Sequence, residues 1–125
     1  MTILTTTPAV DELGETLDVL RTWQHAGGPI QLHPGDIGWF WREGAEATAA
    51  AIRRWRRDGR ILAVGLLDEP ELLRVAIAPE ALADADLTRH LCADVAEPER
   101  GVLPPGEVFV EASTSALLHD QLGAR

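Results

Sequence analysis

The middle of this 125-residue chain constrains its fold more than any other part. Two apolar runs, RILAVGLL (60–67) and LLRVAIA (72–78), lie on either side of the turn-forming residues DEPE (68–71). Apolar runs of this length around such a turn predict a β-hairpin made of well-buried strands. Because buried strands need other elements to cover them, the hairpin predicts a layered domain.

Helical patterns surround the hairpin. They are predicted by the spacing of apolar residues and by the positions of capping residues. Helices are expected from Pro8 to the glycine pair at 27–28, over 45–58, over about 79–95, and from Ser113 or Thr114 to Gly123. The alanine run within 45–58 has high helix propensity, and Ile52 and Trp55 are expected on the buried side of that helix.

Further strands are expected between the helices. They are predicted over 29–32 and 108–112, with 37–42 either a strand or an extended loop and HPGD (33–36) a turn. Strands alternating with helices predict an α/β domain with a mixed sheet flanked by helices, one domain over 1–125. The sequence stops directly after a helix end, where an α/β sheet rarely ends, so we expect more strands after Arg125 and one lobe of a longer protein.

Charge and composition exclude several classes of function. With 20 acidic and 11 basic residues, the formal net charge is −9, which repels nucleic acid and anionic membranes. Cys92 is the only cysteine and the four histidines show no metal-binding spacing, so no metal site is expected. The N-terminus lacks the features of a signal peptide, and no apolar stretch approaches the length needed to span a bilayer. The sequence therefore predicts a soluble cytoplasmic protein without membrane contact.

The only basic cluster is RRWRRDGR (53–60). One interpretation is an anion or nucleic-acid contact with Trp55 interleaved between the arginines. The alternative is pairing with Glu43, Glu46 or Asp58, or with an acidic partner lobe. The acidity of the chain and the position of Trp55 among apolar residues favour the alternative.

The segment HPGDIGWFW (33–41) allows two interpretations. In one it is a substrate-facing loop, with Trp39 and Trp41 beside a pocket and His33 or Asp36 at its edge. In the other it is a strand that points Ile37, Trp39 and Trp41 into the core, which their spacing of two favours. Phe40 would then face outward as a candidate interface residue.

The run from the expected 45–58 helix to the last helix resembles the GNAT-type N-acetyltransferase fold. The resemblance covers the chain from about Leu13 onward. In that family a V-x-P-(E/D) strand end is followed by a Q/R-x-x-G-x-G/A loop, whose backbone N–H groups bind the pyrophosphate of acetyl-coenzyme A. Residues VAIAPE (75–80) match the strand end.

The loop that follows does not match, since Ala81, Asp84 and Asp86 replace its arginine or glutamine and its glycines. Close backbone approach to a phosphate needs residues without bulky side chains. Two like charges about 4 Å apart, at an effective dielectric of about 20, cost roughly 4 kcal/mol, which is roughly a thousandfold in affinity. We therefore expect no tight binding of acetyl-coenzyme A.

The resemblance also implies roles that this sequence fills poorly. The family commonly uses a tyrosine in the last helix as general acid, and this sequence has no tyrosine. His119 could donate a proton from that helix, or it is an ordinary surface histidine. The family's general base is often a glutamate on the middle strands, whereas Glu69 and Glu71 lie in the hairpin connection and are expected to be solvated. No catalytic residue is assigned.

Some members of this family contain two such folds in tandem, one of which has lost the glycine loop. The LHPGDIGWFWREG stretch (32–44) resembles the segment before the second helix in those proteins. The leading interpretation is therefore a non-catalytic lobe that serves domain pairing or pocket formation, with a second lobe or another copy as partner. The alternatives are an active acetyl-coenzyme A-dependent N-acetyltransferase with an atypical cofactor loop, or an unrelated small-ligand or protein-binding module.

Overall fold

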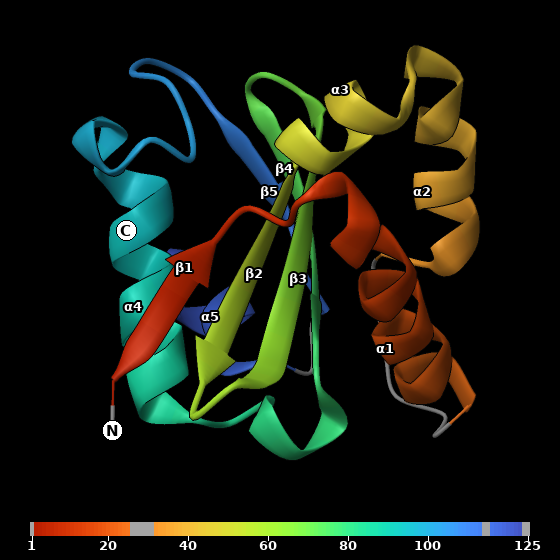
Figure 1. Cartoon of the computed structure of the whole chain (residues 1–125). Coiled ribbons are helices and arrows are strands. Elements are labelled where there is room, and N and C mark those ends of the chain that lie inside the picture. Colours follow the sequence, from red (N-terminus) through yellow and green to blue (C-terminus); the bar gives the residue numbers. More distant parts are fainter. Residues whose placement is uncertain (1, 26–31, 114–115, 124–125) are drawn as a thin grey trace.

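The computed structural model describes residues 2–25, 32–113 and 116–123 (Figure 1). Its centre is a five-stranded sheet in the order β1-β2-β3-β4-β5, in which β4 and β5 are parallel and all other neighbours are antiparallel. The strands are β1 (Ile3–Thr6), β2 (Ile52–Arg57), β3 (Arg60–Glu69), β4 (Leu72–Ile77) and β5 (Phe109–Glu111). The expected α/β architecture with a mixed sheet flanked by helices is confirmed.

Helices cover both faces of the sheet (Figure 1). The α-helices are α1 (Leu13–His25), α2 (Pro34–Phe40), α3 (Ala45–Ala50), α4 (Ala85–Ala96) and α5 (Leu117–Gly123). Short 3-10 turns are η1 (Val10–Glu12), η2 (Trp41–Glu43), η3 (Pro79–Ala81) and η4 (Pro98–Arg100). Helices α1 and α2 lie on one face, and α4 and α5 lie on the other.

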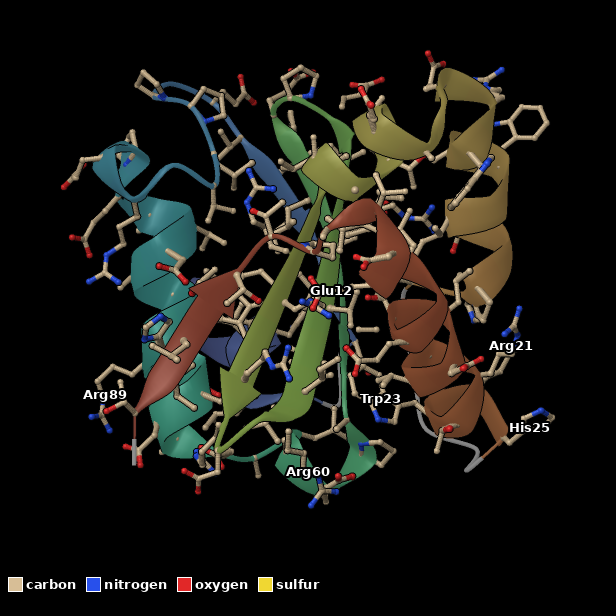
Figure 2. The ribbon with its side chains drawn as sticks, in the orientation of Figure 1. Glu12, Arg21, Trp23, His25, Arg60 and Arg89 are labelled. Carbon is tan, nitrogen blue, oxygen red and sulfur yellow. The ribbon has the colours of Figure 1, made fainter. Side chains whose placement is uncertain are left out.

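Consecutive residues of β2 show how the two layers are attached, because neighbouring side chains on a strand point to opposite faces. Arg54 is 2% exposed and pairs with Glu12 and Glu15 on the α1 side; Figure 2 shows Glu12 over the sheet beside α1. Trp55 is fully buried on the other side, where its indole Nε1 donates to Asp94 of α4 over 2.8 Å. Strand β2 is therefore buried on both faces.

The predicted hairpin is confirmed as β3 and β4, and the 108–112 prediction is confirmed as the shorter β5. The predicted helix over 79–95 is a 3-10 turn followed by α4, and the last helix is present as α5. The first helix begins later than predicted, at Leu13 after a 3-10 turn. The predicted strand 29–32 lies outside the described residues except for Leu32, which is buried and not in a strand.

Two predictions were wrong. The helix expected over 45–58 ends at Ala50, and residues 52–57 form β2, because pairing with both β1 and β3 outweighs local helix propensity. Residues 33–36 were expected as a turn and 37–42 as a strand or an extended loop, but residues 34–43 form α2 and η2. Strand β1 was not predicted.

Gly65 makes the tight packing of the sheet possible. A Cβ atom at this position would lie 2.8 Å from Leu73 Cδ1 and 3.0 Å from Trp55 Cζ3, and both of those side chains are fully buried. Such distances are too short for ordinary van der Waals contact, so any side chain here must displace the core.

We expect Gly65→Ala to lower the free energy of unfolding by about 1–3 kcal/mol, the usual cost of overpacking. The measurement is urea unfolding, read as a shift of midpoint at unchanged slope. Gly14→Ala is the matched control, because a Cβ there meets no atom within 4 Å and alanine raises helix propensity by up to about 1 kcal/mol. Equal destabilisation by the two variants would contradict the packing argument.

Candidate functional site

The junction between β4 and α4 is the position at which the family resemblance places a cofactor. Asp84 is the N-cap of α4, and its Oδ1 accepts a hydrogen bond from the Leu87 amide over 2.9 Å. Arg57 of β2 donates to the same carboxylate over 2.9 Å. A carboxylate from the chain itself therefore occupies the helix start, where an anion would otherwise bind.

Three backbone amides of this junction, those of Ala81, Asp84 and Leu87, already donate hydrogen bonds. The Ala81 amide donates to Ala78 and the Asp84 amide donates to Ala81, while the Leu87 amide donates to the Asp84 side chain. Ala81 is also buried, with 3% of its surface exposed. A diphosphate would have to displace both the capping carboxylate and these hydrogen bonds, so the residues present do not fit that group.

The pKa of Asp84 lies below its ordinary value of 3.8, chiefly because the Leu87 amide and then the Arg57 guanidinium favour the ionised carboxylate over the opposing effect of partial burial. Arg60 pairs with Glu80, and Asp86 pairs with Arg89 over 3.2 Å. Figure 2 shows Arg60 beside η3 and Arg89 on the outer side of α4. The acids of the junction are thus each matched by an arginine.

These ion pairs also show which carboxylates the arginines of the basic cluster 53–60 contact. Its arginines do not pair with Glu43, Glu46 or Asp58, as was expected among the alternatives. Arg54, Arg57 and Arg60 instead reach carboxylates on α1, α4 and the turn η3. Arg54 and Arg57 reach opposite helix layers because residues 52–57 form a strand, which turns its side chains alternately to the two faces. Arg60 reaches η3 from the start of β3.

Strands β4 and β5 diverge beyond a short parallel pairing. The register joins Leu72 to Phe109 and Arg74 to Glu111, and β4 then continues to Ile77 without a partner on that side. The chain after β5 turns toward α4, since the Leu117 amide donates to the Leu82 carbonyl over 2.9 Å. The sheet therefore opens between β4 and β5 on the side of the junction.

His33 and Asp36 lie at the start of α2, rather than in an isolated turn. His33 is the N-cap, and its amide donates to Asp36 Oδ2 over 2.8 Å. Arg74 of β4 lies 3.1 Å from Asp36 Oδ1 and 3.0 Å from Glu111. Burial opposes ionisation of Asp36, but the His33 amide and Arg74 outweigh it and lower its pKa below 3.8. These contacts give Asp36 a structural role that attaches α2 to the sheet.

The side chains of the three aromatic candidates, Trp39, Phe40 and Trp41, have the opposite orientations to those predicted for a strand. Ile37 is fully buried and Phe40, three residues later, is partly buried against the core. Trp39 is 68% exposed and Trp41 is 42% exposed. Ile37 points inward as predicted, but the predicted inward orientation of Trp39 and Trp41 was wrong. The outward orientation of Phe40 was also wrong, because the segment is helical and its inward spacing is three.

Sequence reasoning missed a polar cluster around Asp94, a residue of α4 with only 4% of its surface exposed. Its Oδ2 accepts from Trp55 Nε1 over 2.8 Å and from the Thr5 hydroxyl over 2.5 Å, and Arg100 donates to Oδ1 over 3.2 Å. Only the spacing of His90 and Asp94 on one helix face hints at this cluster in the sequence.

The Asp94 cluster contains a hydroxyl, an imidazole and a carboxylate, but not in a nucleophilic arrangement. His90 Nε2 lies 3.0 Å from Thr5 Oγ1 and 3.4 Å from Asp94 Oδ2. In a catalytic triad the carboxylate and the hydroxyl contact different ring nitrogens, whereas here both face the same one. The cluster therefore serves to join β1, β2 and α4.

Among the described residues, no group of histidine, cysteine and carboxylate side chains could hold a metal ion, and no helix has the length and apolarity to cross a membrane. The sequence matches no known protein-family model and no curated protein significantly.

We expect Asp84→Ala to destabilise the protein by about 0.5–2 kcal/mol at neutral pH, the usual cost of losing an N-cap. Asp84→Asn keeps a capping oxygen and loses only the charge, so its loss of stability is smaller. Because the folded-state pKa of Asp84 is depressed, its charge stabilises the protein above the unfolded value near 3.8. That contribution disappears as the pH falls through the lower folded-state value.

Urea unfolding as a function of pH measures this difference. The gap between the native chain and Asp84→Asn should close below about pH 4. Asp18→Asn is the control, because Asp18 is 76% exposed and pairs only with exposed Arg21, and it should change stability by less than about 0.5 kcal/mol. A constant gap down to pH 2 would contradict the assignment.

Proposed function

We propose that this chain is a GNAT-like lobe of the acetyltransferase family, which does not bind acetyl-coenzyme A tightly and acts in domain pairing or pocket formation. The fold supports this proposal in two ways. Three antiparallel strands, β2 to β4, are followed by a helix and a parallel strand, β5. Strands β4 and β5 then diverge, as the splayed middle strands do in the family that the sequence resembles.

The main support for a lobe that does not bind acetyl-coenzyme A is the position of the Asp84 carboxylate at the start of α4. There it is hydrogen-bonded to Leu87 and paired with Arg57. Its two oxygens take the hydrogen bonds and the positive charge that a diphosphate would use there. Asp86 adds a second negative charge in the first helical turn. Both effects raise the cost of placing a dianionic group at the junction.

Catalytic groups are also weakly supported. His119, the candidate proton donor, is exposed on α5. Glu69 and Glu71 lie at the tip of the β3–β4 hairpin rather than inside a pocket. Their mutual hydrogen bond and repulsion raise the pKa of Glu69 above 4.5, which reflects crowded charges at the tip. His119 also borders a surface hollow of about 500 Å³ whose other lining side chains are apolar, so we assign no acid–base pair there.

Calorimetry with acetyl-coenzyme A tests this proposal. We expect no binding by the native chain at micromolar concentrations. Asp84→Gly/Asp86→Gly should gain measurable binding, since it restores the bare loop at a cost of only a few tenths of a kcal/mol at the cap. Ala81 stays unchanged because it is buried.

Asp84→Asn/Asp86→Asn is the matched control, because it removes the same charges without baring the backbone, and its gain should be smaller. Thermal unfolding verifies that each variant is folded. Micromolar binding by the native chain would favour an active acetyltransferase instead. A folded glycine variant without any gain would contradict the GNAT-like assignment of the loop.

A further inference from the structure

The end of α2 and the turn η2 carry an unusual exposed surface. We call Trp39, Phe40 and Trp41 the aromatic patch. Trp39 is 68% exposed and Trp41 is 42% exposed, while the other two tryptophans, Trp23 and Trp55, are buried. Exposed tryptophans are typical of interaction sites, because burying them on a partner is favourable.

Trp39 and Phe40 of the aromatic patch border a surface hollow of about 310 Å³. The hollow is lined by Trp39, Phe40, Arg42, Glu43, Ala47 and Asp68. It therefore lies between the end of α2, the helix α3 and the end of β3, which approach one another at one end of the sheet (Figure 1). Its lining combines aromatic faces with carboxylates, a combination that suits a cationic group with an apolar stem.

One ring of the patch already holds a cation. The guanidinium carbon of Arg42 lies 4.4 Å from the centroid of the Trp39 ring. An arginine at this distance is attracted by the electron-rich face of the indole. The contact shows that Trp39 is presented in a way that allows guanidinium stacking at the protein surface.

The charge around the hollow is negative. Asp68 connects the hollow to the tip of the hairpin, where Asp68 and Glu71 both act on Glu69, and Arg74 connects it to Asp36 and Glu111. Of the charged groups only Arg42, Glu43 and Asp68 line the hollow itself; with Glu69 and Glu71 at the adjoining hairpin tip, carboxylates outnumber guanidinium groups there. Because these acids exceed their cations, this end attracts a basic group.

A second copy of the chain is poorly suited to bind this surface. Each copy carries a formal net charge of −9, and among the described arginines all but Arg53 and Arg56 pair with carboxylates of their own chain. Arg53 and Arg56 donate to backbone carbonyls instead. The chain therefore has few cations to offer to its own acidic surface, and the same charge repels nucleic acid.

We infer that the aromatic patch and the adjoining hollow bind an arginine-rich segment of a partner protein. One guanidinium group of this segment would stack on Trp39, and others would pair with Asp68, Glu43 and the hairpin acids. Arginine suits this surface better than lysine because its planar group both stacks and forms two parallel hydrogen bonds. The inference rests on the proposed pairing function and specifies the chemistry of the partner.

Titration with an acetylated, amidated hexa-arginine peptide, followed by calorimetry and tryptophan fluorescence, tests this inference. We expect saturable binding that weakens with salt and is weaker for hexa-lysine. Trp39→Ala should weaken binding by roughly 3- to 30-fold, the range of a cation–π contact. Asp68→Asn/Glu71→Gln should weaken it at least as much as Trp39→Ala.

Matched controls separate a defined site from general attraction to an acidic protein. Leu4→Ala truncates another exposed apolar residue, at 58% exposure, and Asp18→Asn/Glu99→Gln removes the same charge from exposed sites elsewhere. Both should bind within twofold of the native chain. The inference is overturned if no peptide binds, if the controls lose as much affinity as the site variants, or if sedimentation shows a dimer that Trp39→Ala dissociates.

The two experiments fail independently. If the native chain binds neither the peptide nor acetyl-coenzyme A, the proposal of a non-catalytic lobe is kept and the inference of an arginine-rich partner is rejected. Micromolar acetyl-coenzyme A binding together with site-specific peptide binding would overturn the proposed function and keep the binding surface.

Discussion

The hydrogen bond from the Trp55 indole to Asp94 is the contact on which the layered structure depends most. Both groups are buried, so neither could be satisfied by water if the other were removed. The same carboxylate accepts from Thr5 of β1 and from Arg100 after α4. One side chain thus fixes the edge strand, the neighbouring strand and the covering helix, while Arg54 does the same toward α1.

This arrangement explains which parts of the fold the sequence could predict. The β3–β4 hairpin, α4 and β5 have local signals, namely apolar runs, turn residues and helical spacing, and they were predicted nearly in place. Strand β2 was mistaken for helix because its alternation is hidden: Arg54 is buried as fully as Trp55. A buried arginine is recognisable only when Glu12 and Glu15 are known to lie above it.

The candidate site was predictable to a similar extent. The acids of the β4–α4 junction could be read from the sequence, and Asp84 does cap the helix. The pairing of Asp84 with Arg57 and of Glu80 with Arg60 could not, since these residues come from different elements and meet only in the folded sheet. Only the pair of Asp86 and Arg89 is local to one helix. The exposure of Trp39 was mispredicted for a related reason. Spacing of two and spacing of three both fit IGWFW, and Pro34 with the Asp36 capping contact decides for a helix.

The excess negative charge of the chain is unevenly distributed between its two ends. At the β4–α4 junction each acid has an arginine of its own, so the field there is largely cancelled at short range. At the hairpin tip the acids crowd one another enough to raise the pKa of Glu69, which costs stability. Folding alone gives no reason to keep crowded carboxylates next to the hollow that Trp39 and Asp68 line. A cationic partner gives one, because it would relieve the repulsion and cover the aromatic rings in a single contact.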